Sequence, residues 1–270
     1  MRSVGSGDVA ADVVKSDGGV VGRWTVVIPA RLGSKRFPRK VLADVGGRSV
    51  LEHVWRAAVE ATGRADVTVL TDSDELVAHV ERFGGRARLT SPDARNGTER
   101  AAEHLADHDA EAVMNVQGDD PFVTPELLRA AMAAHDGNDA PVTTPVHQLA
   151  DGRDDDPNVV KVVRGVDGDA LYFSRAPIPL FRDGGASAPQ PRWGHVGLYC
   201  YDRAALARYA TLPEGILEAA EKLEQLRFLE HGITVRTFET SYVPSAIDTP
   251  ADLARLAAAR PNPTGPEEAA

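Results

Sequence analysis

Cysteine, long apolar runs and excess positive charge are scarce or missing in this sequence. Cys200 is the only cysteine in 270 residues, which excludes a disulfide framework and a cysteine-based zinc or iron–sulfur site within one chain. No apolar run approaches the roughly 18 to 20 residues that a membrane-spanning helix needs, and residues 1–23 lack the apolar region of a signal peptide. We therefore expect a cytoplasmic protein that does not bind membranes.

The net charge argues against a nucleic-acid partner. Lys and Arg number 30 against 40 Asp and Glu, a net charge of -10, whereas nucleic-acid binding relies on an excess of cations. Against this acidic background one loop, residues 29–40, stands out because it carries five cations: Arg31, Lys35, Arg36, Arg39 and Lys40.

Apolar segments alternate with amphipathic segments in the first half of the chain. The pattern predicts strands over residues 24–29, 67–70 and 112–116, and helices that begin after caps such as Ser49 and Thr124. This alternation is typical of an α/β fold in which a mostly parallel sheet carries helices on both faces. Ligands of such sheets bind at the carboxyl ends of the strands.

The second half of the chain is richer in strands before the first pattern returns. We predict strands over residues 140–146, 159–164, 170–173 and 196–201, then a helix over about 217–231 and a strand over 234–238. The chain should therefore divide into a disordered arm (1–23), an α/β part (24–139), a strand-rich lobe (140–216), a return to the α/β core (217–260) and a disordered tail (261–270).

The cation-rich loop directly follows the first predicted strand, so it should lie where ligands bind. Gly33 and Ser34 let backbone N–H groups turn toward phosphate oxygens, while Arg supplies forked donors and Lys a compact charge. The loop therefore suits a polyphosphate, although a solvated basic loop is the alternative. The loop matches neither the GxxxxGK[ST] phosphate loop nor the GxGxxG dinucleotide turn. The sequence therefore gives little support to a P-loop protein or to a Rossmann dehydrogenase.

Two carboxylates could hold a divalent cation. Asp119, in the segment NVQGDDP, follows the predicted strand over 112–116, and Asp248 comes immediately before the last predicted helix. Hard cations such as Mg²⁺ take carboxylate oxygens and bridge phosphates. An ordinary turn at Asp119 and a helix cap at Asp248 are the alternatives.

Polar residues in three further segments are candidates for binding. In RNGTERAAE, Asn96, Gly97 and Thr98 precede a predicted helix and could cap it or recognise a base. His195 and Tyr199 should share one face of a strand, and Glu224 and Gln225 the polar side of a helix. For His195 a purely structural role is the more frequent alternative.

Together these segments resemble the family of cytidylyltransferases that activate 3-deoxy-manno-octulosonate (KDO), the CMP-KDO synthetases. The similar segments run in family order from about Val26 to Leu256: VVIPARLGSKRFPRKVL, NGTERAAE, NVQGDDPF, PNVVKVV, ALYFSRAPIP, HVGLYCY, EKLEQLR and IDTPADL. The resemblance implies a nucleotidyltransferase-type, Rossmann-like fold, with CTP bound by the 24–139 part and the acceptor by the 140–216 lobe. It also implies Mg²⁺ and a homodimer formed through that lobe.

The resemblance also implies a role for each matching residue. Arg36, Lys40 and Asp119 would be catalytic, and Asp119 and Asp248 would hold Mg²⁺. The nucleotide would be bound by Pro29, Ala30, Arg31, Lys40, Thr71, Asp72, Asn96, Gly97 and Thr98. A small acidic acceptor would be bound by Gln117, Arg175, His195, Tyr199, Glu224 and Gln225. We expect direct in-line attack of an acceptor oxygen on the α-phosphorus, with release of pyrophosphate.

Departures from the family pattern keep other acceptors open. Cys200 stands where the family usually has Gly, Pro177 where it has Thr, and the loop over 182–192 is rich in proline. We expect these changes to flank the acceptor site, so a small phosphonate acid is an alternative acceptor. A metal-dependent glycosyltransferase and a non-catalytic nucleotide-binding protein are alternatives of other classes.

Overall fold

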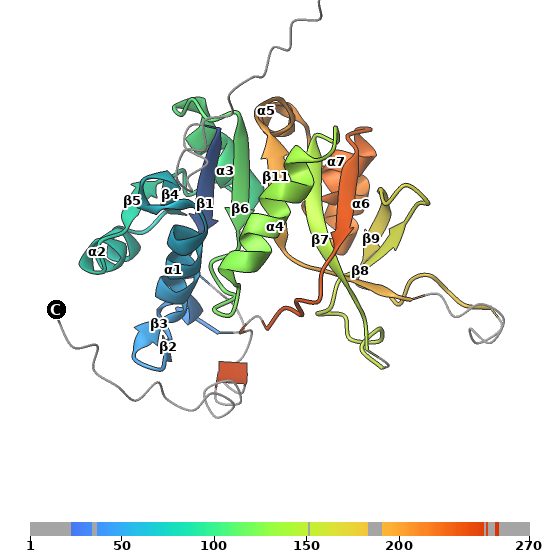
Figure 1. Ribbon diagram of the computed structural model, residues 1–270, viewed down its shortest axis with the longest axis horizontal. Coiled ribbons are helices and arrows are strands. Elements are labelled where there is room, and N and C mark those ends of the chain that lie inside the picture. Colours follow the sequence, from blue (N-terminus) through green and yellow to red (C-terminus); the bar gives the residue numbers. More distant parts are fainter. Residues whose placement is uncertain are drawn as a thin grey trace, which may run out of the picture.

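The computed structural model describes residues 23–33, 37–150, 152–182, 191–245, 247 and 252–253. Most of this chain is built around one twisted sheet whose strands run in the order β5-β4-β1-β6-β11-β7-β10-β8-β9, with β12 beside β7 (Figure 1). A separate small sheet pairs β2 (Asp44–Val45) with β3 (Arg48–Ser49).

The first half of the sheet is parallel. It contains β1 (Trp24–Pro29), β4 (Val67–Thr71), β5 (Arg86–Leu89) and β6 (Ala112–Val116). β1 pairs with both β4 and β6, so these strands end side by side. The loops that follow β1, β4 and β6 consequently lie at one edge of the sheet, as the sequence predicts.

Local capping explains where the first helices begin. In α1 (Val50–Thr62), α2 (Asp74–Arg82), α3 (Gly97–Ala106) and α4 (Pro125–Asp136), the side chain of the cap accepts a hydrogen bond from a backbone N–H three residues along. The four caps are Ser49, Ser73, Asn96 and Thr124. The predicted helix starts are confirmed.

The strand-rich segment continues the same sheet with antiparallel pairing. β11 (Leu198–Asp202) lies antiparallel to both β6 and β7 (Val142–Gln148), and it thereby joins the two halves. Beyond β7 come β10 (Trp193–His195), β8 (Lys161–Arg164) and β9 (Ala170–Ser174), while β12 (Val235–Glu239) runs parallel to β7. The predicted α/β class, with helices on both faces, is confirmed; the division into separate parts stays a prediction.

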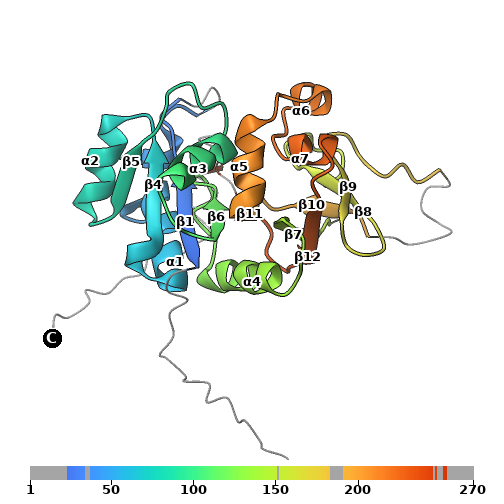
Figure 2. The same ribbon diagram turned by 90° about the horizontal axis from the view of Figure 1, so that it is seen from above.

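Helices pack on both faces of the sheet. One apolar cluster joins β1 to α1, α2 and α4, and the other joins β1 to α3, α5 (Arg203–Thr211) and α7 (Leu226–Glu230). Figure 2 shows α1 and α4 below the strands, α3, α5 and α7 above them, and α2 beside β5 at one end of the sheet. None of the helices in the described ranges combines the length and hydropathy required to cross a bilayer.

Two local predictions were wrong, and one helix was missed. The single helix expected over 217–231 is two helices, α6 (Ile216–Glu221) and α7, because Lys222 adopts a left-handed conformation (φ 55°) that ends α6. α5 was not predicted. The single strand expected to hold both His195 and Tyr199 is two strands, β10 and β11, because the chain bends at Gly197.

The remaining elements are short. Two 3-10 turns occupy Lys40–Leu42 (η1) and Arg64–Asp66 (η2). The predicted tail, the caps of the last helix and all of the predicted arm except Arg23 lie outside the described residues.

Candidate active site

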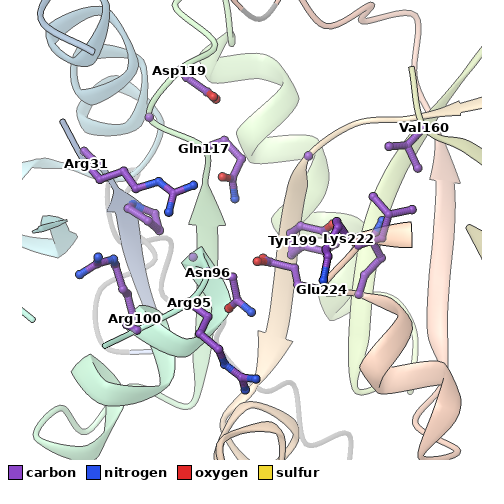
Figure 3. Close-up of a pocket in the computed structure, with 18 of the residues that line it drawn as sticks. Arg31, Arg95, Asn96, Arg100, Gln117, Asp119, Val160, Tyr199, Lys222 and Glu224 are labelled. Atoms are coloured by element: carbon purple, nitrogen blue, oxygen red, sulfur yellow. The ribbon is translucent and has the colours of Figure 1, made fainter. Parts of the chain in front are cut away.

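A cavity of about 1000 Å³ opens at the edge where the parallel strands end. One wall comes from the loop after β1, the start of α3 and the residues after β6; the other comes from β10, β11 and the segment between α6 and α7. Figure 3 shows the two walls facing each other, with Gln117 between them. Thirteen of the predicted site residues line this one cavity: Pro29, Ala30, Arg31, Lys40, Asn96, Gly97, Gln117, Asp119, Arg175, His195, Tyr199, Glu224 and Gln225.

Close backbone packing shapes the first wall. A Cβ atom on Gly118 would lie 2.8 Å from the Pro29 carbonyl oxygen, and one on Gly97 would lie 3.1 Å from the Pro29 ring. A side chain at Gly118 would therefore force apart the ends of β1 and β6. The two glycines keep the strand ends together and leave the cavity open above them.

Lys40 and Asp119 form an ion pair on this wall. The Lys40 Nζ lies 2.5 Å from an Asp119 carboxylate oxygen, and the two side chains are 14% and 31% exposed. Lys40 comes from η1 and Asp119 from the loop after β6, so residues far apart in sequence meet here. The Ile247 N–H donates to the Asp119 carbonyl at 3.3 Å, which brings the chain segment before Asp248 to the same place.

The cations of the loop over 29–40 do not all face the cavity. Arg31 is exposed and lines it, but Arg39, with a left-handed backbone (φ 63°), turns away and binds both carboxylate oxygens of Glu75. Arg36, which the sequence predicts to be catalytic, and Asp248, predicted to hold the metal, lie outside the described residues.

Three residues predicted to bind the nucleotide do not line the cavity. Thr71 is buried, and its hydroxyl accepts from the Ser73 N–H at 3.2 Å. The Asp72 carboxylate receives the Arg100 guanidinium at 2.6 Å. Thr98 is buried, with no surface on the cavity. Asn96 does line the cavity, and it also caps α3 by accepting from the Glu99 N–H at 2.8 Å.

Two arginines on the first wall were missed by the sequence reasoning. Arg100 lines the cavity from the first turn of α3 and is 4% exposed, and Arg95 lines it just before that helix. Both belong to the segment RNGTERAAE that we singled out for other residues. Arg95 is paired with Glu99 and Glu214, and Arg100 with Asp72, so carboxylates balance the charge of both arginines.

His195 and Tyr199 meet on the second wall although they belong to two strands. Their ring centroids lie 5.3 Å apart, and the His195 ring also contacts Phe173 at 5.1 Å. The His195 Nε2 lies 3.0 Å from the Thr144 hydroxyl. Burial lowers the pKa of His195 to about 3, so the ring is neutral at physiological pH and offers hydrogen bonds rather than charge.

Arg175 is held by backbone carbonyls on the same wall. Its Nε donates to the Glu221 carbonyl at 3.0 Å, and its Nη1 donates to the Pro157 carbonyl at 3.0 Å. The buried ammonium of Lys161 donates to the carbonyl of Arg175 itself at 2.5 Å. The guanidinium thus keeps its charge at the cavity wall with no carboxylate bound directly to it among the described residues.

Glu224 and Gln225 lie in the break between α6 and α7, and not on the polar side of a helix as predicted. Burial raises the pKa of Glu224 to about 6 even though the Thr98 hydroxyl donates to its carboxylate at 2.7 Å. Lys222 begins this break and lines the cavity, but we did not predict it as a site residue. Its signal in the sequence is that it is one of only five lysines.

Not all of the residues that differ from the family pattern lie on this wall. Cys200 is buried in the apolar cluster on the opposite face of β11 from Tyr199, so the expectation that it flanks the acceptor site was wrong. Pro177 is exposed and lies three residues after β9. Residues 183–190 lie outside the described residues.

The described residues contain no group of three or more His, Cys, Asp or Glu side chains placed to hold a metal ion. Asp119 is nevertheless a half-buried carboxylate on the cavity wall, beside the segment that leads to Asp248. Mg²⁺ is commonly bound through one or two carboxylates together with substrate phosphates. The donor set is therefore suited to a cation that arrives with a phosphorylated ligand.

Comparisons with known proteins agree on one family. The sequence model of the cytidylyltransferases matches residues 25–237. The 3-deoxy-manno-octulosonate cytidylyltransferase of Solibacter usitatus (strain Ellin6076) is 45% identical over 233 residues, covering 85% of this chain and 91% of that protein. The enzyme of the same name from Escherichia coli is 40% identical over 235 residues, covering 86% and 94%.

Solved structures extend the likeness to three dimensions. A CMP:2-keto-3-deoxy-manno-octonic acid synthetase complexed with CTP superposes with a TM-score of 0.81 at 38% identity, covering 88% of this chain and 98% of that one. The 4-diphosphocytidyl-2C-methyl-D-erythritol synthase of Anaerococcus prevotii DSM 20548 gives a TM-score of 0.58 at 18% identity, covering 87% and 95%. The second likeness shows the nucleotidyltransferase-type fold alone.

Proposed function

Because the chain belongs to the cytidylyltransferase family, we propose that it transfers CMP from CTP to 3-deoxy-manno-octulosonate and releases pyrophosphate. The observation that carries this proposal is the single cavity that joins the Lys40–Asp119 pair to the wall of Arg175, His195 and Tyr199. Ligand pockets commonly measure about 300–1,000 Å³, so this one is large enough for a nucleotide and a sugar acid together.

The first wall is suited to the nucleoside triphosphate. Arg31 is exposed on this wall, and Lys40 places its ammonium beside Asp119, so both can meet phosphate oxygens. Arg100 also lines this wall, where its guanidinium is paired with Asp72 at 2.6 Å. Pro29, Ala30, Asn96 and Gly97 line the part of the cavity where we propose that the cytosine and ribose bind, with Thr71 and Asp72 supporting them from behind.

The second wall is suited to a hydroxylated carboxylic acid. Arg175 and Lys222 supply positive charge for the acceptor carboxylate, while the neutral His195 and the Glu224 carboxylate can bind hydroxyl groups. Gln117 lies between the walls, and Tyr199 and Gln225 complete the acceptor wall. The comparisons do not favour a phosphonate acceptor, a glycosyltransferase or a non-catalytic protein.

We propose direct in-line transfer. The oxygen of an acceptor hydroxyl forms a bond to the α-phosphorus and loses its proton to the solvent, the bond from that phosphorus to the bridging oxygen of the β-phosphate breaks, and pyrophosphate leaves with the electron pair. The chain's own residues position the two substrates on facing walls, and Lys40 and Arg31, with Arg36 from the same loop, neutralise the charge that develops on the phosphates.

We propose that Asp119 and Asp248 hold Mg²⁺ when CTP is bound. The metal would withdraw charge from the phosphate oxygens and make the α-phosphorus more electrophilic. Asp119 would then exchange part of its contact with Lys40 for the metal, and the Lys40 ammonium would turn toward the phosphates.

We further propose a cytoplasmic homodimer formed through the strand-rich lobe. Val166 and Leu171 are exposed apolar side chains between β8 and β9 and on β9, at the outer edge of the sheet, and a second copy would cover them.

Pyrophosphate release from CTP with a panel of acceptors tests the proposed function. We expect release with 3-deoxy-manno-octulosonate, none with phosphonoformate, and none from a nucleotide sugar. Release with phosphonoformate alone would show that the acceptor is a phosphonate acid and not the sugar acid. Transfer from a nucleotide sugar would show that the enzyme is a glycosyltransferase. The absence of any turnover would favour a binding protein.

A further inference from the structure

Thr98 starts α3 beside the nucleotide wall, but its contacts lead to the acceptor wall. Its side chain is fully buried, so its hydroxyl has no surface through which to meet a ligand in the cavity. That hydroxyl lies 2.7 Å from the Glu224 Oε1 and 3.0 Å from the Tyr201 hydroxyl. Both partners come from the other half of the sheet or from the segment beyond it.

The direction of these two hydrogen bonds follows from their chemistry. Burial raises the pKa of Tyr201 well above its ordinary value, so the phenol keeps its proton and can donate. The Glu224 carboxylate can only accept. Thr98 has a single hydroxyl proton, so it accepts from Tyr201 and donates to Glu224. The three side chains thus form a directed chain that ends on the acceptor wall.

Glu224 needs such support because its backbone is irregular. It lies between α6 and α7, where no helix fixes its direction. Its backbone carbonyl accepts from the Tyr209 hydroxyl at 3.4 Å, and that hydroxyl accepts from the Asn96 amide at 3.2 Å. Figure 3 shows Glu224 extending from the acceptor wall toward Asn96. Both the carboxylate and the backbone of Glu224 are therefore tied to the start of α3.

We propose that Thr98 is a positioning residue for the acceptor, and not a nucleotide-binding residue: its hydroxyl, oriented by Tyr201, aims the Glu224 carboxylate at the acceptor. This inference rests on the proposed function and refines the way in which its acceptor wall is held. It implies that the start of α3 serves both substrates, the nucleotide through Asn96 and Gly97 and the acceptor through Thr98.

Steady-state kinetics of Thr98→Val and Thr98→Ser test the proposal. Valine has nearly the same shape but no hydroxyl, whereas serine keeps it. Loss of a hydrogen bond to a charged group predicts that Thr98→Val raises the KM for the acceptor at least about tenfold, while the KM for CTP changes less than about twofold. Thr98→Ser should restore the acceptor KM to near the wild-type value.

Two outcomes would overturn the proposal. A rise in the KM for CTP with an unchanged acceptor KM would make Thr98 a nucleotide residue, and equal defects in the valine and serine variants would make its role one of packing. If Thr98→Val does not fold, Tyr201→Phe replaces it, because that change removes the donor that orients Thr98 and should also raise the acceptor KM selectively. The wild-type reaction, run in parallel, reports separately on the proposed function: no product there would refute the function itself.

Discussion

The ammonium of Lys40 lies 2.5 Å from the carboxylate of Asp119, on the cavity wall at the ends of the neighbouring parallel strands β1 and β6. The cation that we propose for the phosphates and the carboxylate that we propose for the metal are thus in contact before either ligand binds. The pair neutralises itself in the free enzyme, and binding of a metal-bound triphosphate would let both charges act on the substrate.

Replacement of Lys40 by alanine should weaken the use of CTP more than the use of the acceptor. We expect the KM for CTP to rise at least about tenfold, because a charge-assisted contact to phosphate is lost and Asp119 is left unpaired. Initial rates with each substrate varied in turn measure this. Arg39→Ala is the matched control, because Arg39 binds Glu75 on the exposed surface and should leave both KM values unchanged. A selective rise in the KM for the acceptor would show that Lys40 binds the acceptor and not CTP.

Replacement of Asp119 by asparagine should lower turnover at least about a hundredfold at saturating CTP, as the loss of a metal ligand commonly does. The neighbouring Asp120 supplies the control, because its carboxylate accepts from the Tyr242 hydroxyl at 2.6 Å and does not line the cavity. Single-turnover rates of Asp119→Asn and Asp120→Asn should therefore differ strongly. Equal rates would remove Asp119 from the metal site.

The pH dependence of acceptor use should reflect Glu224. Burial raises the pKa of Glu224 to about 6, with the carboxylates of Glu218 and Glu99 adding to the rise and the Thr98 hydroxyl opposing it. Because the ionised form accepts hydrogen bonds from the acceptor, kcat/KM for the acceptor should increase with pH through about 6 and level off above it. Burial lowers the pKa of His195 to about 3, so His195 should add no step. In Glu224→Gln the step should be absent; its persistence would assign it to another group.

Arg227 should matter for stability more than for chemistry. Its guanidinium is 1% exposed, binds both Glu218 oxygens at 2.6 Å, reaches Glu99 at 3.2 Å and lies over the Tyr209 ring. Arg227→Met leaves the buried Glu218 carboxylate without its arginine partner and should lower the free energy of unfolding by about 3–5 kcal/mol. Urea denaturation measures this. Arg153→Ala, which removes an exposed pair with Asp156, should cost less than about 1 kcal/mol. Equal effects would contradict the account.

The sequence predicts the first half of the fold well because its signals are local. Ser49 and Thr124 cap helices through bonds to residues three positions away, and Trp24–Pro29 is apolar except for Thr25. The carboxyl ends of parallel strands meet by geometry, so the strand pattern predicts that the loops carrying Lys40 and Asp119 lie close together.

The rest of the site depends on contacts that no local pattern contains. Glu218 and Arg227 pair across the break between two helices, and this contact, with the left-handed Lys222, divides a segment whose sequence favours one helix. Thr98 and Glu224 lie 126 positions apart, so their hydrogen bond has no signature in the sequence. Arg39 and Lys40 are neighbours that face opposite ways, which a count of cations does not distinguish.

Phosphorus NMR of the complete reaction tests the central claim most directly. With CTP, Mg²⁺ and 3-deoxy-manno-octulosonate, the three CTP resonances should be replaced by one phosphodiester resonance and by pyrophosphate in equal molar amounts, and the Asp119→Asn enzyme should leave CTP unchanged over the same time. A phosphodiester that does not appear with this acceptor, or the formation of inorganic phosphate in place of pyrophosphate, would contradict the account.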